Sequence, residues 1–224
     1  MCTSDGDPPY GGWRRAGALG ERGSPDRDAQ ARPDVRSAIW KAPVAGPVRA
    51  RGANLAGDAQ ADRKAHGGSD KALYAYAAED LEWWSGQLGL KLGPGSMGEN
   101  LTTAGLDLSE AVVGERWRVG TVVLQVTQPR IPCYKLGIRL GDDRSPERFA
   151  MARRPGIYLR ILAEGTLQTG DEIQVVERPA HRFRAVEVAH IFYDRHHRAG
   201  ELLGVAELAE SWHHWARKVL APTR

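Results

Sequence analysis

The sequence predicts a mainly β protein: a barrel-like domain with inserted helices, followed by a small α-helical module at the C-terminus. In the central part of the chain, short aliphatic runs are separated by glycine turns, which is typical of a barrel or rolled sheet rather than a doubly wound fold. Beyond Pro179 the apolar residues instead recur at helical spacing. We therefore expect a barrel domain over residues 35–178 and a three-helix extension over residues 179–224.

The first part of the barrel domain predicts short strands and one helix. Prolines interrupt residues 37–51, so this segment predicts short, broken strands. A polar loop follows over residues 57–68. Asp70 is a plausible N-cap for a helix whose apolar stripe runs over residues 73–88. The Gly-Pro-Gly sequence at 93–95 then predicts a turn.

The middle of the chain is rich in predicted strands. Residues 111–119 and 122–127 form two strand-like runs, and the second alternates between apolar and polar positions, as a half-buried strand does. Residues 157–162 and 171–176 predict two more strands. A short helix is expected over residues 146–153. This density of short strands is the main support for a barrel.

The C-terminal part, residues 184–220, predicts two or three short helices. Trp212 and Trp215 give this module a tryptophan-rich face. That face either packs on the barrel or forms a contact in a homodimer, and the sequence leaves both interpretations open.

Composition narrows the class of protein. The chain has 224 residues, a formal net charge of +3 and two cysteines. The mild charge and the lack of a basic-aromatic array argue against a nucleic-acid-binding barrel. Two cysteines argue against a disulfide scaffold and favour a reducing compartment. No apolar run approaches the roughly 18 residues that span a membrane. We expect a cytoplasmic protein without membrane contact.

The N-terminal segment, residues 1–34, is rich in glycine, proline, aspartate and arginine. Such a composition buries too little apolar surface to offset the chain entropy lost on folding. It also lacks the apolar core of a signal peptide. We expect a disordered tail, or a translation start assigned too far upstream, and we leave it out of the fold.

Cys133 is the first candidate for chemistry. It lies in the segment Gln-Pro-Arg-Ile-Pro-Cys-Tyr-Lys-Leu, residues 128–136. Prolines fix the backbone before the thiol, and Arg130 and Lys135 place positive charge nearby. Positive charge favours the thiolate, which is the form that attacks or binds metal. The residues alone leave two alternatives, a reactive centre or an ordinary buried cysteine.

Two glycine-containing motifs could bind a polar or anionic ligand. His66-Gly-Gly precedes Lys71 and the predicted helix, whose N-terminal N–H groups could face an anion. In the segment 98–103, Asn100 and Thr102 could form hydrogen bonds with a polar ligand. The structural alternative in both cases is a turn.

Arginine and histidine residues in the second half give weaker signals. Arg153 and Arg160 could bind phosphate in bidentate fashion, and the alternative is a solvated basic loop. The histidines between His181 and His214 show no ligand spacing tied to a carboxylate or cysteine, so a zinc site is not expected.

Four motifs, in order, resemble the MOSC family, which is named after the C-terminal domain of molybdenum cofactor sulfurases. They are Ser-Ala-Ile-Trp-Lys at 37–41, His-Gly-Gly-x-Asp-Lys-Ala-Leu-Tyr-Ala-Tyr at 66–76, Gly-Glu-Asn-Leu at 98–101 and Gln-Pro-Arg-x-Pro-Cys-x-Lys-Leu at 128–136. The chain is most similar to the bacterial stand-alone subgroup linked to reduction of N-hydroxylated purines such as 6-hydroxylaminopurine. The resemblance covers about residues 37–220 and implies a barrel-like fold with a three-helix extension.

The resemblance also implies a cofactor. The family's invariant cysteine matches Cys133, which would ligate molybdenum in a pterin cofactor, or carry a persulfide as in sulfur-transfer relatives. The residues implied to hold the cofactor's phosphate and pterin edge are Lys71, Arg130, Arg153 and Arg160, and His66, Asn100 and Thr102. Pyridoxal phosphate belongs to fused sulfurases through a separate domain, and we do not expect it to act here.

The resemblance implies a detoxifying oxidoreductase that reduces N-hydroxylated small molecules. Because the sequence contains no flavin or nicotinamide motif, an external electron-donor reductase is the expected partner. The alternative is a non-catalytic carrier that hands over the cofactor or a persulfide sulfur.

Overall fold

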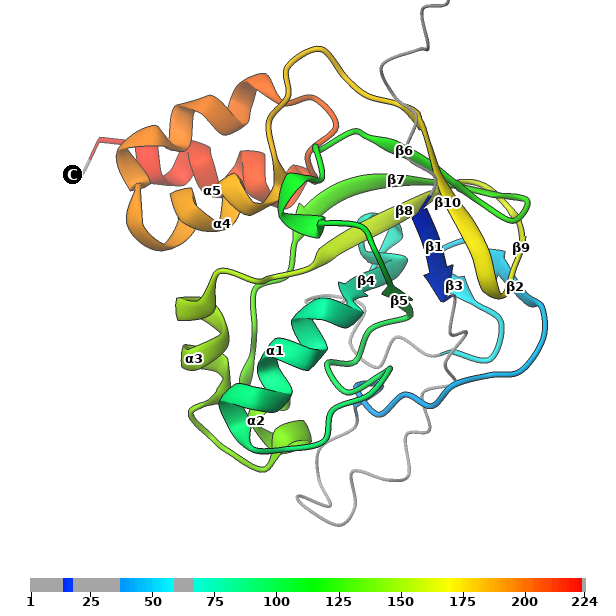
Figure 1. Cartoon of the computed structure of the whole chain (residues 1–224). Helices are drawn as coiled ribbons and strands as arrows, with labels where there is room; N and C mark the ends of the chain where they lie inside the picture. The colour runs from blue at the N-terminus through cyan, green and yellow to red at the C-terminus, as the bar shows by residue number, and fades with distance from the viewer. Residues whose placement is uncertain (1–13, 18–36, 59–66, 223–224) are drawn as a thin grey trace, which may run out of the picture.

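The computed structural model describes residues 14–17, 37–58 and 67–222 (Figure 1). His66 and most of the expected tail over residues 1–34 lie outside the described residues. Within that tail, however, Arg14–Gly17 forms strand β1, which pairs with strands β10 and β5. For these four residues the structure departs from the sequence-based expectation, because they belong to the barrel.

Seven strands of the described chain form a closed barrel in the order β1-β10-β6-β7-β8-β4-β5. Neighbouring strands are antiparallel except β4 and β5, which run parallel. The strands are β1 (Arg14–Gly17), β4 (Leu73–Ala77), β5 (Leu101–Thr103), β6 (Arg116–Val119), β7 (Val122–Pro129), β8 (Ile157–Ala163) and β10 (Thr169–Glu177). The predicted barrel-like, mainly β fold is confirmed.

A separate three-stranded sheet lies beside the barrel in the order β3-β2-β9. It consists of β2 (Val48–Arg51), β3 (Asn54–Leu55) and β9 (Gly165–Leu167). The strands expected earlier in residues 37–51 do not form: the chain from 37 to 47 has no regular structure. Pro43 and Pro47 explain this difference, because each lacks the N–H that a sheet ladder requires.

The helix predicted over residues 73–88 is wrong in its first third. Residues 73–77 form β4, and α1 (Ala78–Leu88) begins only afterwards. All five residues of β4 are buried because the strand has a packed layer on each side. Leu73 and Ala75 face the barrel core, whereas Tyr74 and Tyr76 face a second apolar cluster. An apolar run buried on both faces also matches a helical stripe, so the local pattern could not separate the two.

The second apolar cluster lies outside the barrel, among α1 and two short helices, α2 (Tyr134–Leu140) and α3 (Ser145–Ala152) (Figure 1). Its buried members are Tyr74, Tyr76, Leu81, Trp84, Met97, Leu136 and Phe149. Helix α3 confirms the helix predicted over residues 146–153. Helix α2, directly after Cys133, was not predicted, because its seven residues are too few to show a clear period.

The remaining strand predictions are confirmed with altered ends. Strands β7, β8 and β10 occupy the segments predicted for them. Strand β6 is shorter than the predicted run over residues 111–119, since Val112 forms only an isolated bridge to Arg184. The turn predicted at residues 93–95 is confirmed, since residues 94–97 form a turn.

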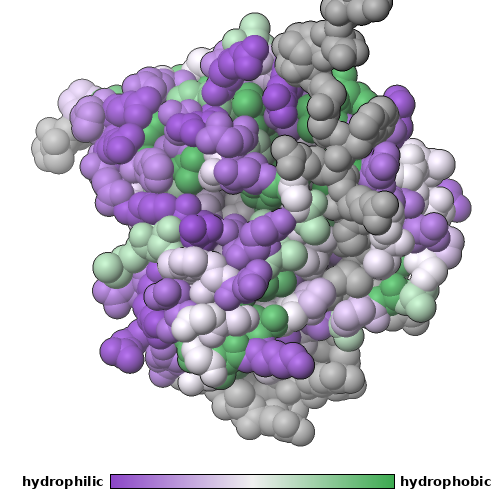
Figure 2. Space-filling model, in the orientation of Figure 1, coloured by the Kyte–Doolittle hydropathy of each residue, from purple (hydrophilic) through white to green (hydrophobic). Residues whose placement is uncertain are grey.

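The C-terminal module contains helix α4 (Ala185–Asp194), the 3-10 segment η4 (His196–Gly204) and helix α5 (Glu210–Leu220). In Figure 1 it lies against one end of the barrel, and residues of all three elements join the barrel's apolar core. Trp212 is only 7% exposed, so this tryptophan packs on the barrel. On the face shown in Figure 2, the surface of the module is mostly hydrophilic. No helix in the described part of the chain is long and apolar enough to cross a membrane.

Candidate functional site

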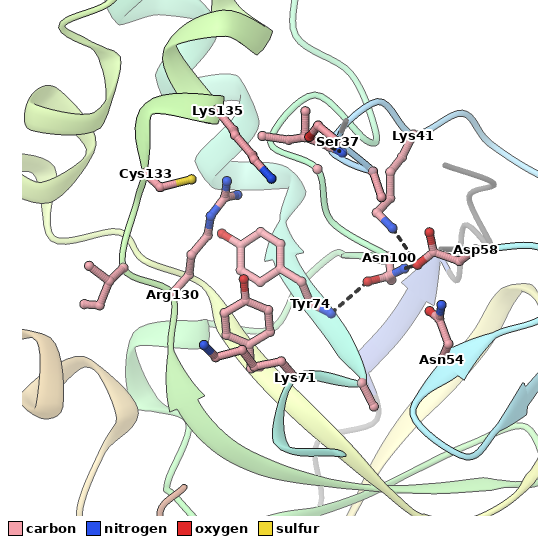
Figure 3. A pocket seen from close by; sticks show the side chains of 16 residues that line it. Ser37, Lys41, Asn54, Asp58, Lys71, Tyr74, Asn100, Arg130, Cys133 and Lys135 are labelled. Carbon is pink, nitrogen blue, oxygen red and sulfur yellow. Dashed lines mark hydrogen bonds and ion pairs between the residues drawn. The ribbon is translucent and has the colours of Figure 1, made fainter. Parts of the chain in front are cut away.

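An open pocket lies between the end of β7, strand β4 and the irregular segment after residue 36 (Figure 3). Among the described residues that line it, four carry positive charge and one carries negative charge. The cations are Lys41, Lys71, Arg130 and Lys135, and the anion is Asp58. The pocket is therefore positively charged and suited to an anionic ligand.

Cys133 lines this pocket at the point where the chain leaves β7 and enters α2. Pro129 ends the strand, and Pro132 restricts the backbone just before the thiol. The carbonyl of Cys133 accepts a hydrogen bond of 2.9 Å from the backbone N–H of Leu136, which fixes the first turn of the helix. The thiol is half-buried, and its sulfur points into the pocket toward Arg130 and Lys135 (Figure 3).

Arg130 lies beside the thiol, 6% exposed. Its guanidinium donates a hydrogen bond to the carbonyl of Met97 and lies 4.9 Å from the ring centroid of Tyr74. Burial lowers the pKa of Arg130, but the negative charge that Tyr74, Tyr158 and Cys133 can carry raises it more, so the net shift is upward. A guanidinium stays charged in proteins, so Arg130 places a fixed positive charge beside the sulfur of Cys133 (Figure 3).

Two tyrosines form one wall of the pocket. The rings of Tyr74 and Tyr158 lie 5.2 Å apart, and the Nζ of Lys71 lies 6.0 Å from the ring centroid of Tyr158. Burial raises the pKa of both phenols and outweighs the opposing effect of Arg130. Both side chains are therefore neutral near pH 7. The hydroxyl of Tyr74 donates a 2.8 Å hydrogen bond to the carbonyl of Pro155.

Beside Tyr74, another part of the pocket wall is a chain of polar contacts. The Oδ1 of Asn100 accepts a hydrogen bond from the backbone N–H of Tyr74 at 3.0 Å, and its Nδ2 donates to Asp58 at 2.7 Å. Asp58 also forms a 2.6 Å ion pair with Lys41, and both side chains are almost completely buried. The sequence predicted no role for Asp58, which lies in none of the four motifs, and Lys41 was noted only as the last residue of the first motif.

The structure brings together four of the candidate residues from the sequence in one pocket: Lys71, Asn100, Arg130 and Cys133. Three others lie outside it. The hydroxyl of Thr102 donates to the buried carboxylate of Glu99 at 3.0 Å. Arg153 and Arg160 instead connect the barrel region to the C-terminal module. His66 lies outside the described residues.

Arg153 and Arg160 are engaged by other parts of the protein. Arg153 forms an ion pair with Asp194 at the end of α4, and its guanidinium lies 4.6 Å from the ring centroid of Tyr193. The Nη2 of Arg160 forms a 2.9 Å ion pair with Asp70 and donates to the carbonyl of Glu207 at 3.1 Å. Both arginines therefore join segments far apart in the sequence.

The anion site expected at a helix N-terminus after residues 66–68 does not form. Ser69–Lys71 is a three-residue 3-10 turn, η2, and the chain continues directly into β4. No long helix follows, so no row of N–H groups faces an anion there. Lys71 reaches the pocket by its side chain instead.

The segment 98–103 supports the pocket wall, and its residues Gly98 and Asn100 line the pocket. Glu99 is fully buried, and its carboxylate accepts hydrogen bonds from the backbone N–H groups of Gly95 at 2.7 Å and Met97 at 3.0 Å. Gly98 has φ +77°, and a Cβ there would lie 2.7 Å from Cγ1 of Ile39, a residue of the pocket wall. Glu99 was not among the site residues predicted from the sequence, because no pattern in the neighbouring residues indicated that its carboxylate would be buried.

We expect Glu99 to make stability depend on pH. Burial raises the pKa of this carboxyl above its ordinary 4.5. The folded state then binds more protons than the unfolded state between 4.5 and the raised value, so the stability that Glu99 contributes falls as pH rises through that window. Glu99→Gln removes this slope and leaves an N–H donor facing a backbone N–H, at a cost of about 1–3 kcal/mol. Urea unfolding of both proteins across this pH range measures the difference.

Glu201 provides a control of opposite sign. Its carboxyl is exposed and bonded to Arg198, which lowers its pKa. Its contribution is present above 4.5 and is lost as pH falls, so Glu201→Gln should remove a slope in the other direction. A difference between wild type and Glu99→Gln that does not change with pH would contradict the role given to Glu99.

The fold and the pocket together define a class of β-barrel proteins. Its members carry a thiol in a cationic pocket and a helical module at the C-terminus. The chain belongs to the MOSC domain family, which it matches over residues 62–174. The resemblance inferred from the four sequence motifs is therefore confirmed.

Several relatives support this membership. The chain is 33% identical to the uncharacterized protein YflK of Bacillus subtilis over 184 residues, covering 80% of this chain and 82% of that one. It is 34% identical to protein YiiM of Escherichia coli over 194 residues, covering 82% and 84%. The crystal structure of YiiM from Geobacillus stearothermophilus superposes with a TM-score of 0.75 at 28% identity, covering 91% and 98%. A Gibberella moniliformis protein named "Reductase" is 30% identical, but this chain spans only 29% of its length.

Proposed function

We propose that this chain binds a molybdenum–pterin cofactor through Cys133 and reduces N-hydroxylated compounds, such as N-hydroxylated purines. The observation that carries the proposal is a thiol facing an open, positively charged pocket. A thiolate is a soft ligand suited to a soft metal centre, and clustered cations suit a phosphate-bearing group. Membership of the MOSC family and the relative named "Reductase" support the same assignment.

The residues present fit such a cofactor. Among the described residues, no three His, Cys, Asp or Glu side chains gather to hold a metal by themselves. Cys133 would be the protein's ligand, and the other ligands would come from the cofactor. Cys133 would hold the metal, while Lys71 and Lys135 would face the anionic part of the cofactor. The bound cofactor would supply the two-electron chemistry that reduction of an N–O bond requires.

The protein's own residues would prepare the pocket for that chemistry. Arg130 balances the charge of the Cys133 thiolate and is itself held by Met97 and Tyr74. Reduction of an N-hydroxyl group to an amine takes two electrons and two protons and releases water. Lys71 and Lys135 line the pocket and would be the candidate proton donors, because a positioned lysine side chain can act as a general acid. The electrons would come from an external reductase.

The test is the molybdenum content of purified protein. Wild type and Cys133→Ala are expressed in a host whose cofactor pathway is intact, and molybdenum per chain is measured by mass spectrometry. We expect molybdenum in wild type and in the control Cys2→Ser, which removes the other thiol, and a strong loss in Cys133→Ala. Equal, near-zero molybdenum in wild type and Cys133→Ala would overturn the proposal.

A carrier of the cofactor or of a persulfide sulfur is the second candidate. The openness of the pocket favours it as much as it favours an enzyme, since a group held by one thiolate in an open pocket can also leave. A carrier would bind molybdenum in a Cys133-dependent manner but would not turn over N-hydroxylated purine with an artificial electron donor.

A further inference from the structure

The turn η2 brings Lys71 to the pocket. Hydrogen bonds from strand β7 to its middle residue, Asp70, hold this turn in place. The hydroxyl of Thr127 donates a 2.6 Å hydrogen bond to the carbonyl of Asp70, and Nε2 of Gln128 donates to the same carbonyl at 3.3 Å. Both donors lie at the end of β7, shortly before Cys133. The position of Lys71 is therefore tied to the strand that delivers the thiol.

Gln128 is in turn held by the C-terminal module. The indole N–H of Trp212, in α5, donates to Oε1 of Gln128 at 2.9 Å, and both side chains are buried. An indole can only donate and a backbone carbonyl can only accept, so these two partners fix the orientation of the Gln128 amide. The ring of Trp212 is packed against Phe192 and Trp215, at centroid distances of 5.5 and 6.0 Å. The C-terminal module thus orients the Gln128 side chain, which donates a hydrogen bond to η2.

Arg160 provides a second, separate connection between the C-terminal module and Asp70. One guanidinium nitrogen contacts both the carboxylate of Asp70, at 2.9 Å, and the carbonyl of Glu207, at 3.1 Å. Glu207 belongs to the loop between η4 and α5 of the module. The first connection ends on the backbone of Asp70 and the second on its side chain. Together they restrain η2 in two directions.

We propose that the C-terminal module positions Lys71 in the pocket, and that Trp212, Gln128 and Arg160 are positioning residues that act through Asp70. The module would then hold the cationic wall in the orientation that an anionic, phosphate-bearing ligand needs. This inference deepens the function proposed for the same pocket. Its test uses no bound cofactor, so the two proposals can fail separately.

The test compares two alkylating reagents at Cys133 in the Cys2→Ser background. The thiolate attacks iodoacetate, which is negatively charged, or iodoacetamide, which is neutral; in each case a sulfur–carbon bond forms and iodide leaves. The ratio of the two rates cancels the thiolate fraction and reports the positive potential that the anionic reagent meets in the pocket. A change in the thiolate fraction alone therefore does not change the ratio.

We expect Lys71→Ala to lower the ratio of the iodoacetate rate to the iodoacetamide rate about two-fold at low ionic strength. That is the size of effect expected for unit charges on the order of 10 Å apart in water. Trp212→Phe keeps an aromatic ring and the net charge but removes the indole donor, and it should lower the ratio in the same direction. In the Lys71→Ala background, Trp212→Phe should add nothing. High salt should remove the differences.

Trp117→Phe is the matched control. Trp117 is also buried and also donates its indole N–H to a side chain, but that side chain is Glu115, at 2.7 Å, and not Gln128. It should cost stability and leave the ratio unchanged. If Trp212→Phe does not fold, Gln128→Met removes the same link from the barrel side and is measured in its place.

Three outcomes would overturn the inference: a ratio that Lys71→Ala does not change, a ratio that Lys71→Ala lowers and Trp212→Phe does not, or an equal effect of Trp212→Phe with and without Lys71. Molybdenum content separates this result from the proposed function. Normal molybdenum in wild type with an insensitive ratio would remove the positioning role alone. The expected ratios with no molybdenum in wild type would remove the proposed cofactor alone.

Discussion

Cys133→Ser is expected to reduce turnover of an N-hydroxylated purine by about 100-fold or more. Loss of an outer partner of a metal ligand typically costs 10–100-fold, so loss of the ligand itself should cost at least the upper end of that range. Serine has nearly the same shape as cysteine but lacks the thiolate, which is the form that binds metal, and its hydroxyl ionises far less readily than a thiol. The half-buried position of Cys133 makes this substitution mild for the fold. The measurement is turnover with an artificial electron donor, on protein expressed in a host whose molybdenum cofactor pathway is intact.

The control for this prediction is Cys2→Ser, which should keep wild-type turnover. Comparison of molybdenum content with turnover then separates the two candidate functions. Loss of both in Cys133→Ser fits a reductase that uses the metal. Wild-type protein that holds molybdenum but shows no turnover fits the carrier. Full turnover by Cys133→Ser would contradict Cys133 as the metal ligand.

The second large effect is expected at Gly156, where Gly156→Ala should destabilise the protein by about 2–5 kcal/mol. Gly156 has φ +60°, and a Cβ there would lie 2.6 Å from the carbonyl of Ala75 and 2.9 Å from the hydroxyl of Tyr74. The left-handed backbone costs about 1–2 kcal/mol for alanine, and overpacking a close contact costs a further 1–3 kcal/mol. Because Tyr74 forms a wall of the pocket, we also expect ligand binding to weaken.

Gly141→Ala is the matched control for this prediction. Gly141 has φ +72°, but a Cβ there would meet nothing within 4 Å. Its substitution should cost only the backbone term of about 1–2 kcal/mol. Chemical denaturation of both variants isolates the steric contribution. Equal losses at the two positions would show that Gly156 is needed only for its backbone conformation and not for the close approach of β4.

The motif Arg153-Arg-Pro-Gly156 illustrates why sequence analysis assigned some site residues to the wrong neighbourhood. Within this motif, Arg153 was the candidate for phosphate binding. In the structure, the carbonyls of Arg154 and Pro155 accept hydrogen bonds from the hydroxyls of Tyr76 and Tyr74. Those tyrosines lie 78 and 81 residues earlier in the chain. No local pattern reports such partners, because the pairing depends on β4 and β8 being adjacent in the barrel.

By itself, the sequence determined the mainly β class, the helical C-terminus, the MOSC resemblance and Cys133 as the residue to test. These depend on local periodicity and on motifs whose members are close in the chain. Only the tertiary structure decided that residues 73–77 form a strand, that Arg153 and Arg160 face the C-terminal module, and that Lys41 and Asp58 line the pocket. The physical reason is the same in each case. Burial on two sides, ion pairs and hydrogen bonds between distant segments exist only once the barrel brings those segments together.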